Sequence, residues 1–254
     1  ELTERRPIVD LAVFRHRGFS VSVAALSAAF ATFFASAVII PQWLQVSMGY
    51  TATYAGYVTA FTGVAAVFMS PVAAKLTTRV DPRLLVCCGV MWLGATSLLR
   101  AFWTSGADFW TLALPQLLQG FGMPFFFIPL TTIALGAVEP EETASAAGVM
   151  SFLRTVAGAV GTTVAVSLWD DRARAARSEM AARLNGAEVS ASLQANGFSL
   201  DQVRGLVEGL VEREAMAVAT NQVFFLSALI FALAAMLIWL SPRPSRAADP
   251  GAAH

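Results

Sequence analysis

The chain has 254 residues, of which 56% are hydrophobic and 13% are charged, and its 17 basic and 17 acidic residues balance to zero formal charge. Soluble domains carry about 25% charged residues. This composition therefore excludes a protein whose whole surface faces water, and we expect most of the chain to lie in lipid. Zero net charge also gives no support for nucleic-acid binding.

The sequence carries none of the common catalytic or metal-binding signatures. It has no Gly-x-Ser-x-Gly, no His-Glu-x-x-His, no phosphate-binding loop and no paired aspartates within an apolar run. Cys87 and Cys88 are adjacent in an apolar run and are predicted to be small buried hydrophobes. His16 and His254 have no other potential metal ligands near them at the spacing of a metal site. We predict a protein that is not an enzyme and that needs no cofactor or metal.

Residues 1–18 are charged, with four arginines just before the first long apolar run. We expect a cytoplasmic linker here, with a short interfacial helix that dips into lipid. The chain begins without Met, so we expect it to be a piece of a longer protein. Six apolar runs follow, each near the ~20 residues that cross a bilayer. They are predicted at about 19–42, 52–76, 84–103, 109–137, 145–169 and 221–240.

The positive-inside rule gives these spans an orientation. With residues 1–18 in the cytoplasm, the next cytoplasmic loop holds Lys75, Arg79 and Arg83, and the tail at 242–254 is cytoplasmic too. The acidic turn at 138–144 is the exception. Its Pro and carboxylates suit the first turn of a helix, and an ionic latch to the three basic residues, or to an absent partner domain, is the alternative.

The polar segment at 170–219 lies on the far, periplasmic side in this orientation. Residues 170–185 are predicted to continue the fifth helix to a cap at Asn185-Gly186. A second helix is predicted from Ser199, whose spacing to Gln202 suits a capping box, to about Met216. Its apolar stripe either packs on the neighbouring helix or docks a partner protein. The domains are thus 1–18, 19–169, 170–219, 220–241 and 242–254.

Two motifs place amides inside the membrane. PQWLQ at 41–45 and PQLLQ at 115–119 each carry two glutamines three residues apart, close to one helical face. An amide can bind a substrate without the cost of a buried charge, or can join helices to each other. We predict that one wall of a substrate path contains Gln42, Gln45, Gln116 and Gln119. The alternative is that these amides form hydrogen bonds between helices.

Arg154 is interpreted as the one charge placed well inside an apolar run. Such charges are costly and mark function by default. We predict a coupling or substrate role for Arg154, with snorkelling to the interface or pairing with a carboxylate of another bundle as alternatives. Phe125, which follows Pro124 in a run of three phenylalanines, is assigned to the same wall.

Small residues and prolines shape the fourth and fifth spans. Gly120, Gly122, Pro124 and Pro129 are expected to interrupt the fourth, as transporter helices are interrupted along a path. Two stripes of small residues allow close packing of the fifth: Ala147, Ser151 and Thr155, and Ala157 and Gly161. No span contains Asp or Glu, so a titrating group for proton coupling is expected outside this chain.

Several blocks occur in order and at similar spacing in one known family. They are ERRPIVDL at 4–11, FRHRGF at 14–19, GYTATYAG at 49–56, PQLLQG at 115–120, FIPLTT at 127–132 and FLRTVAGAVGT at 152–162. Over residues 4–241 the chain resembles the 14-span drug:proton antiporters of the major facilitator superfamily, the EmrB/QacA type. The resemblance implies that the six runs are helices nine to fourteen. It also implies an inner-membrane pump that works with a periplasmic adaptor and an outer-membrane channel.

We therefore expect an all-α integral membrane protein: a six-helix bundle that is half of a major facilitator fold, with a periplasmic helical hairpin. The expected function is export of hydrophobic, cationic or amphipathic drugs by alternating access coupled to proton antiport, once a missing N-terminal bundle is present. The alternative is a membrane anchor that recruits a periplasmic partner without transport.

Overall fold

A computed structural model describes residues 11–183 and 199–241, and every regular element in these ranges is helical. The linker before residue 11, the Asn185-Gly186 cap and the tail at 242–254 lie outside them. The elements are η1 (Leu11–Arg15), α1 (Arg17–Val46), α2 (Ala52–Thr77), α3 (Pro82–Arg100), α4 (Phe109–Gly136), η2 (Pro140–Glu142), α5 (Thr143–Arg183), α7 (Leu200–Leu237) and η3 (Ile238–Leu240).

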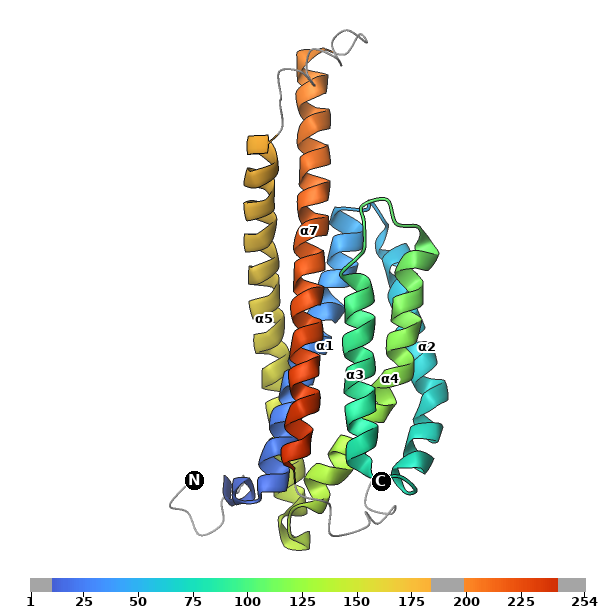
Figure 1. Cartoon of the computed structure of the whole chain (residues 1–254), viewed down its shortest axis with the longest axis vertical. Helices are drawn as coiled ribbons and strands as arrows, with labels where there is room; N and C mark the ends of the chain where they lie inside the picture. Colours follow the sequence, from blue (N-terminus) through green and yellow to red (C-terminus); the bar gives the residue numbers. More distant parts are fainter. Residues whose placement is uncertain (1–10, 184–198, 242–254) are drawn as a thin grey trace.

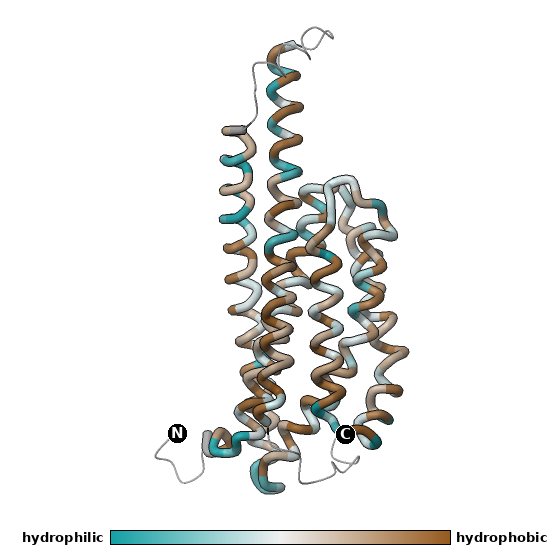
Figure 2. Tube along the Cα trace, viewed as in Figure 1, coloured by the Kyte–Doolittle hydropathy of each residue, from teal (hydrophilic) through white to brown (hydrophobic). Residues whose placement is uncertain are grey.

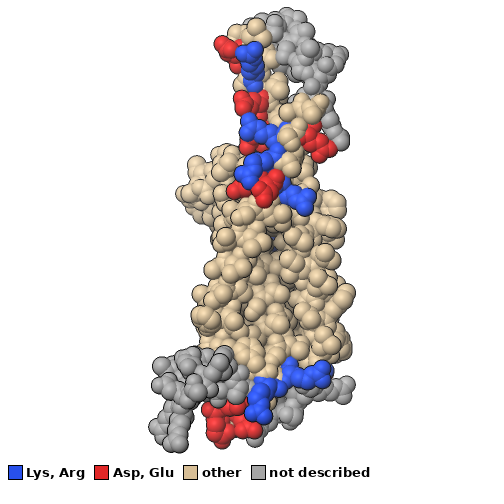
Figure 3. Space-filling model, turned by 90° about the vertical axis from the view of Figure 1, so that its left-hand side faces the viewer, with Lys and Arg blue, Asp and Glu red and all other residues tan. Residues whose placement is uncertain are grey.

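Six of these helices are long and apolar enough to cross a membrane, which confirms the six-span prediction for the described residues. Figure 2 shows the apolar band along the bundle, and Figure 3 shows charged side chains above and below a band without visible charge. The chain therefore forms a membrane-spanning bundle, as its composition predicts.

The helices are arranged around α1, which packs on α5, α7, α4 and α2. On the other side α3 lies between α4 and α7 (Figure 1). The buried share of the most apolar segment is 56% in α1 but only 17% in α2 and 11% in α5. Few residues in the apolar segments of α2 and α5 are therefore fully buried by the other four helices.

Two helices extend well beyond the rest of the bundle at one end (Figure 1). The predicted continuation of the fifth span is confirmed as far as Arg183. The predicted break between a second hairpin helix and the last span is wrong, because α7 is one unbroken helix of 38 residues. No Gly or Pro lies between Met216 and Asn221, so nothing in the sequence stops the helix there.

We call residues 170–183 of α5 and 200–216 of α7 the hairpin helices, and the end of the bundle where they leave it the hairpin end. The other end, where η1 and η2 lie, is the linker end. The capping box predicted at Ser199 and Gln202 is present. Arg177 of α5 pairs with Glu208 at 2.8 Å and with Glu212 at 3.0 Å, which joins the hairpin helices.

Close helix contacts within the bundle depend on glycine, and two of them illustrate this. A Cβ atom on Gly161 of α5 would lie 2.5 Å from the Cβ of Ala31 in α1, so only glycine allows this approach. A Cβ on Gly120 of α4 would lie 2.3 Å from the carbonyl oxygen of Thr62 in α2. The predicted packing role of Gly161 is therefore confirmed, whereas Ser151 and Thr155 are exposed.

The predicted interruption of the fourth span is wrong, because α4 runs unbroken through three prolines. Pro115 has no N–H, so the carbonyl of Thr111 loses its usual partner within the helix. The indole Nε1–H of Trp103 donates to that carbonyl at 3.2 Å. A side chain from the α3–α4 corner thus repairs the helix at its hairpin end.

Candidate functional site

One face of α1 is exposed along the membrane-spanning region. It carries Phe34, which is 41% exposed, Val38, Gln42 and Gln45. We call this strip of α1 the open face. Gly158 of α5 lies directly against the ring of Phe34, where a Cβ would come within 2.9 Å, so α5 borders the open face.

Arg154 of α5 lies beside this face and is half-buried. Its guanidinium carbon is 5.4 Å from the ring centre of Phe30 in α1 and 5.6 Å from that of Phe127 in α4. Both distances are typical of cation–π contacts. Because neither contact uses its hydrogen-bond donors and no ion pair is found for it among the described residues, the guanidinium is held in place without being neutralised.

The aromatic partners of Arg154 were missed by the sequence interpretation. The assignment of Phe125 to the wall stays a prediction; its backbone lies against Gly89 of α3, and its side chain is half-buried. Phe127 is the member of the phenylalanine run that meets Arg154, and Phe30 approaches Phe127 edge to face at 5.3 Å. Phe30 and Phe34 are one helical turn apart on α1, but this spacing does not show that Phe30 meets Arg154.

The two glutamine pairs have different surroundings. Gln42 and Gln45 are exposed on the open face, and Gln45 donates to the carbonyl of Pro41 at 3.0 Å. Gln116 and Gln119 are buried inside the bundle at the hairpin end. The wall assignment of all four stays a prediction. The structure contains interhelical hydrogen bonds at Gln116 and Gln119, which was the alternative role for these amides.

The partner of the second pair is Arg100, the last residue of α3. Its Nη2 donates to Oε1 of Gln116 at 3.0 Å, to Oε1 of Gln119 and to the carbonyl of Pro115 at 3.2 Å. Arg100 is 0% exposed and its guanidinium lies over the ring of Phe224 in α7. Arg154 is therefore the one charge well inside an apolar run of the sequence, but it is not the only charged side chain that packs among the helices, because Arg100 turns inward from the end of α3.

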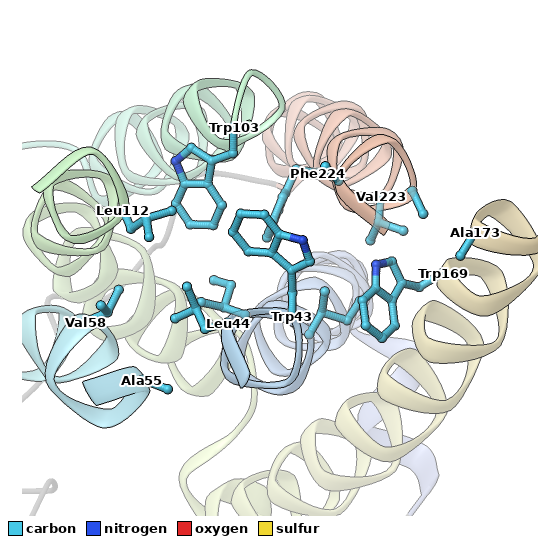
Figure 4. Close-up of a cluster of buried hydrophobic side chains, with 14 residues drawn as sticks. Trp43, Leu44, Ala55, Val58, Trp103, Leu112, Trp169, Ala173, Val223 and Phe224 are labelled. Carbon is cyan, nitrogen blue, oxygen red and sulfur yellow. The ribbon is translucent and has the colours of Figure 1, made fainter. Parts of the chain in front are cut away.

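Three tryptophans lie in a buried cluster at the hairpin end, and Figure 4 shows them with Phe224, the ring that Arg100 contacts. The rings of Trp43 and Trp103 stack with centroids 5.5 Å apart, and Trp103 meets Phe224 edge to face. Trp169 of α5 donates from Nε1 to the hydroxyl of Thr220 in α7 at 2.9 Å. Side chains from α1, α5, α7 and the α3–α4 corner thus form one rigid cluster where the hairpin helices begin.

At the linker end, the acidic turn at 138–144 pairs with His16 rather than with the basic loop named as an alternative partner. Glu142 accepts from Nε2 of His16 at 2.9 Å, and in the described ranges no ion pair joins it to Lys75, Arg79 or Arg83. The capping box between Glu139 and Glu142 supports the helix-start interpretation of the turn.

A shallow apolar cavity of about 460 Å³ lies between α2 and the start of α4. Its lining residues are Tyr54, Tyr57, Ala60, Phe61, Val64 and Phe109. Aromatic side chains of this kind gather where a membrane meets water.

Over the residues that the structure describes, no group of three metal-ligating side chains is present.

Comparison with known proteins gives the family. The family description of the Major Facilitator Superfamily matches residues 2–162. Multidrug export protein EmrB of Escherichia coli (strain K12) is 33% identical over 99% of this chain and 50% of its own length. Fatty acid resistance protein FarB of Neisseria gonorrhoeae is 30% identical over 99% of this chain and 50% of its own length. Multidrug resistance protein Stp of Mycobacterium tuberculosis (strain ATCC 25618 / H37Rv) is 29% identical over 62% of this chain.

The chain spans about half the length of EmrB and FarB. Its six spanning helices match half of a major facilitator bundle and make it a multi-pass protein of the bacterial inner membrane. The resemblance noted in the sequence is thereby confirmed: the chain belongs to the Major Facilitator Superfamily.

Proposed function

We propose that this chain is one half of an exporter that moves hydrophobic or amphipathic compounds across the bacterial inner membrane by alternating access. The observation that carries the proposal is Arg154, a cation held between two aromatic rings beside the open face of α1. A group this costly to place in a membrane is a functional feature by default. The names of the relatives EmrB, FarB and Stp, which refer to drug export or resistance, agree with it.

The wall that this half offers needs a second bundle opposite it. Gly56 and Gly63 of α2 and Gly148 of α5 are exposed, and a Cβ on any of them would meet nothing within 4 Å. Small residues let helices approach closely in membranes. We take these faces of α2 and α5 as the contacts for the missing N-terminal bundle, with the open face between them as one wall of the cavity.

Substrate contact is assigned to Gln42, Gln45, Phe125 and Arg154 in this wall, together with Phe30 and Phe127. Arg154 is a donor without a carboxylate partner among the described residues, and the six spans contain no Asp or Glu. This charge pattern favours amphiphiles with an acidic or acceptor group over cations. Gln116 and Gln119 reach substrate only in a conformation that releases them from Arg100.

Proton antiport is the proposed source of energy. A proton-coupled carrier needs a group that titrates inside the membrane. Because no carboxylate lies within the six apolar runs at 19–42, 52–76, 84–103, 109–137, 145–169 and 221–240, the titrating group is assigned to the other half of the complete protein.

The test uses the full-length protein in proteoliposomes, with efflux of a fluorescent fatty acid and of a cationic dye measured under an imposed pH gradient. We expect gradient-dependent export of the acid. Arg154→Ala should lower it by about tenfold or more at matched protein level, which is the range for one charged hydrogen bond. Arg172→Ala, at an exposed site in the hairpin helices, is the matched control and should export normally. Absence of export by the wild type under every gradient would contradict the proposal.

A second function is favoured by the hairpin helices, which carry exposed leucines in an aqueous region. Leu200, Leu206 and Leu210 are 53%, 47% and 60% exposed. Exposed apolar side chains grouped outside the membrane mark protein contacts. We propose that they contact a periplasmic adaptor that leads to an outer-membrane channel. If this chain serves only as an anchor, the wild type will export nothing and will still bind the adaptor. Replacing all three leucines by Ser will then abolish the binding of the adaptor.

A further inference from the structure

Arg100 occupies an unusual position for a charged side chain in a membrane bundle. It ends α3, yet its side chain turns inward and is completely buried. Its partners come from two helices, because the acceptors lie on α4 and the ring of Phe224 lies on α7. One guanidinium therefore connects three helices at the hairpin end.

Stability alone does not account for a cation at this place. Its three acceptors are neutral oxygens, and no carboxylate is among its partners. A buried charge without a counterion pays a large desolvation penalty, and well-packed apolar residues are often as stable or more stable. A charge kept under these conditions is better explained by the single geometry that it imposes than by the free energy that it contributes.

The shape of the guanidinium matches that role. Gln116 and Gln119 are one turn apart on α4, and a single Nη2 donates to both amide oxygens. Nη2 makes all three contacts, and Nε and Nη1 are buried without a hydrogen-bond partner, so the direction of this one nitrogen decides the register. The third acceptor, the carbonyl of Pro115, belongs to the proline that weakens this part of α4. Sliding or rotating α4 by one residue would break all three contacts.

The part of α4 that Arg100 holds ends where the helix becomes easier to bend. Residues 109–119 are held by Arg100 and by the bond from Trp103 to Thr111. Beyond them come Gly120, Gly122, Pro124 and Pro129, which weaken a helix and permit bending. The network thus holds residues 109–119, and the residues that weaken the helix follow from Gly120 onward.

We propose that Arg100 is a positioning residue that keeps residues 109–119 of α4 in one register against α3 and α7 during transport. This role rests on the proposed export function. It acts through α4 and requires no contact between Arg100 and the substrate. Bending of α4 then moves only the part on the linker side of Gly120.

The test compares four variants of the full-length protein in nanodiscs and proteoliposomes. They are Arg100→Lys, Arg100→Met, the combined Arg100→Met with Gln116→Leu and Gln119→Leu, and the control Leu99→Met, which changes an exposed neighbour. The combined variant removes the charge together with its amide partners, and the hydroxyl of Thr62 keeps the backbone carbonyl of residue 116 as its acceptor. Thermal stability, binding of a fluorescent fatty acid, its transport rate at saturation, and hydrogen exchange along α4 are measured for each.

We expect the combined variant to be at least as stable as the wild type and to bind the ligand with similar affinity. Its transport rate at saturation should fall by about tenfold, a loss equivalent to one charged hydrogen bond. Arg100→Lys should lie between the wild type and Arg100→Met, and Leu99→Met should match the wild type. Hydrogen exchange in the combined variant should rise in residues 109–119 only.

Two outcomes would overturn the proposal. One is wild-type transport by the combined variant, and the other is a loss of stability that parallels the loss of transport, because either makes Arg100 an ordinary packing element. Failure of the wild type to export is a separate result that removes the export function. Hydrogen exchange then decides the register role by itself, and wild-type protection of residues 109–119 in the combined variant would disprove it.

Discussion

The two ends of this bundle are held together by different kinds of contact. At the hairpin end, stacked tryptophans and a buried arginine link α1, α3, α4, α5 and α7. At the linker end, α4 and α5 make few contacts with each other, and Arg154 connects them through aromatic rings. The side-chain hydrogen bond between His16 and Glu142 lies outside the apolar spans. Hydrogen bonds and stacked rings fix one arrangement, whereas the contact of a cation with a ring face is less directional. We propose that the hairpin end stays fixed during transport and that the linker end moves.

The largest effect is expected from breaking the fixed end. Trp43 is completely buried and stacks on Trp103. Truncation to Ala removes that stack and opens a cavity, which should cost about 3–5 kcal/mol of unfolding free energy. Trp110→Ala is the control, because Trp110 is 66% exposed and should cost far less. Thermal unfolding in detergent measures both, and equal losses would show that the hairpin-end cluster is not special.

A smaller effect is expected at a close contact between α1 and α5. Gly161→Ala places a Cβ where Ala31 already lies, so the two helices must separate. Overpacking of this kind costs about 1–3 kcal/mol. Gly209→Ala, on an exposed side of the hairpin helices with open space around it, should not destabilise. Measured unfolding that ranks the two variants in the opposite order would contradict the described α1–α5 contact.

The ion pairs between the hairpin helices should matter less. Arg177 is 48% exposed, and its pairs with Glu208 and Glu212 are open to solvent. Exposed pairs contribute about 0.2–1 kcal/mol and weaken in salt. Arg177→Ala should therefore raise hydrogen exchange in the hairpin helices at low salt only. An effect of the same size at high salt would mean that the side chain acts through packing.

The smallest effect concerns the start of α4. The side-chain hydrogen bond from Thr111 lowers the pKa of Asp108 below its usual value. A folded pKa below the unfolded one means that this contribution is present above the unfolded pKa and is lost as pH falls through the folded pKa. Thr111→Val should raise the pKa of Asp108 in an NMR titration, with Thr53→Val as a control on an exposed residue of α2. An unchanged titration would contradict the assigned hydrogen bond.

Apolar run length was sufficient to predict the six spans, because crossing a bilayer imposes a fixed length on a helix. It was not sufficient for Arg100. Hydropathy cannot tell an arginine that leaves the end of a helix for water from one that turns inward, and the deciding partners, Gln116 and Gln119, belong to another helix. The glutamine spacing was recognised, but its partner depends on how α3 and α4 pack.

The continuity of α7 is a different case, since the absence of Gly and Pro between Met216 and Asn221 was visible in the sequence. The prediction of a break there followed the change from polar to apolar residues, although polarity changes do not end a helix. The contact of Arg154 with Phe30 and Phe127 required three helices to be placed together. No pattern within one helix contains that information.

The contrast between the two ends is tested most directly by spin-label distances in the full-length protein with Cys87 and Cys88 replaced. One pair of labels, at Leu114 and Phe225, reports the hairpin end, and a second pair, at Thr132 and Met236, reports the linker end. On adding saturating substrate, the first distance should stay unchanged while the second shifts. A shift of the first distance with no change in the second would contradict the account.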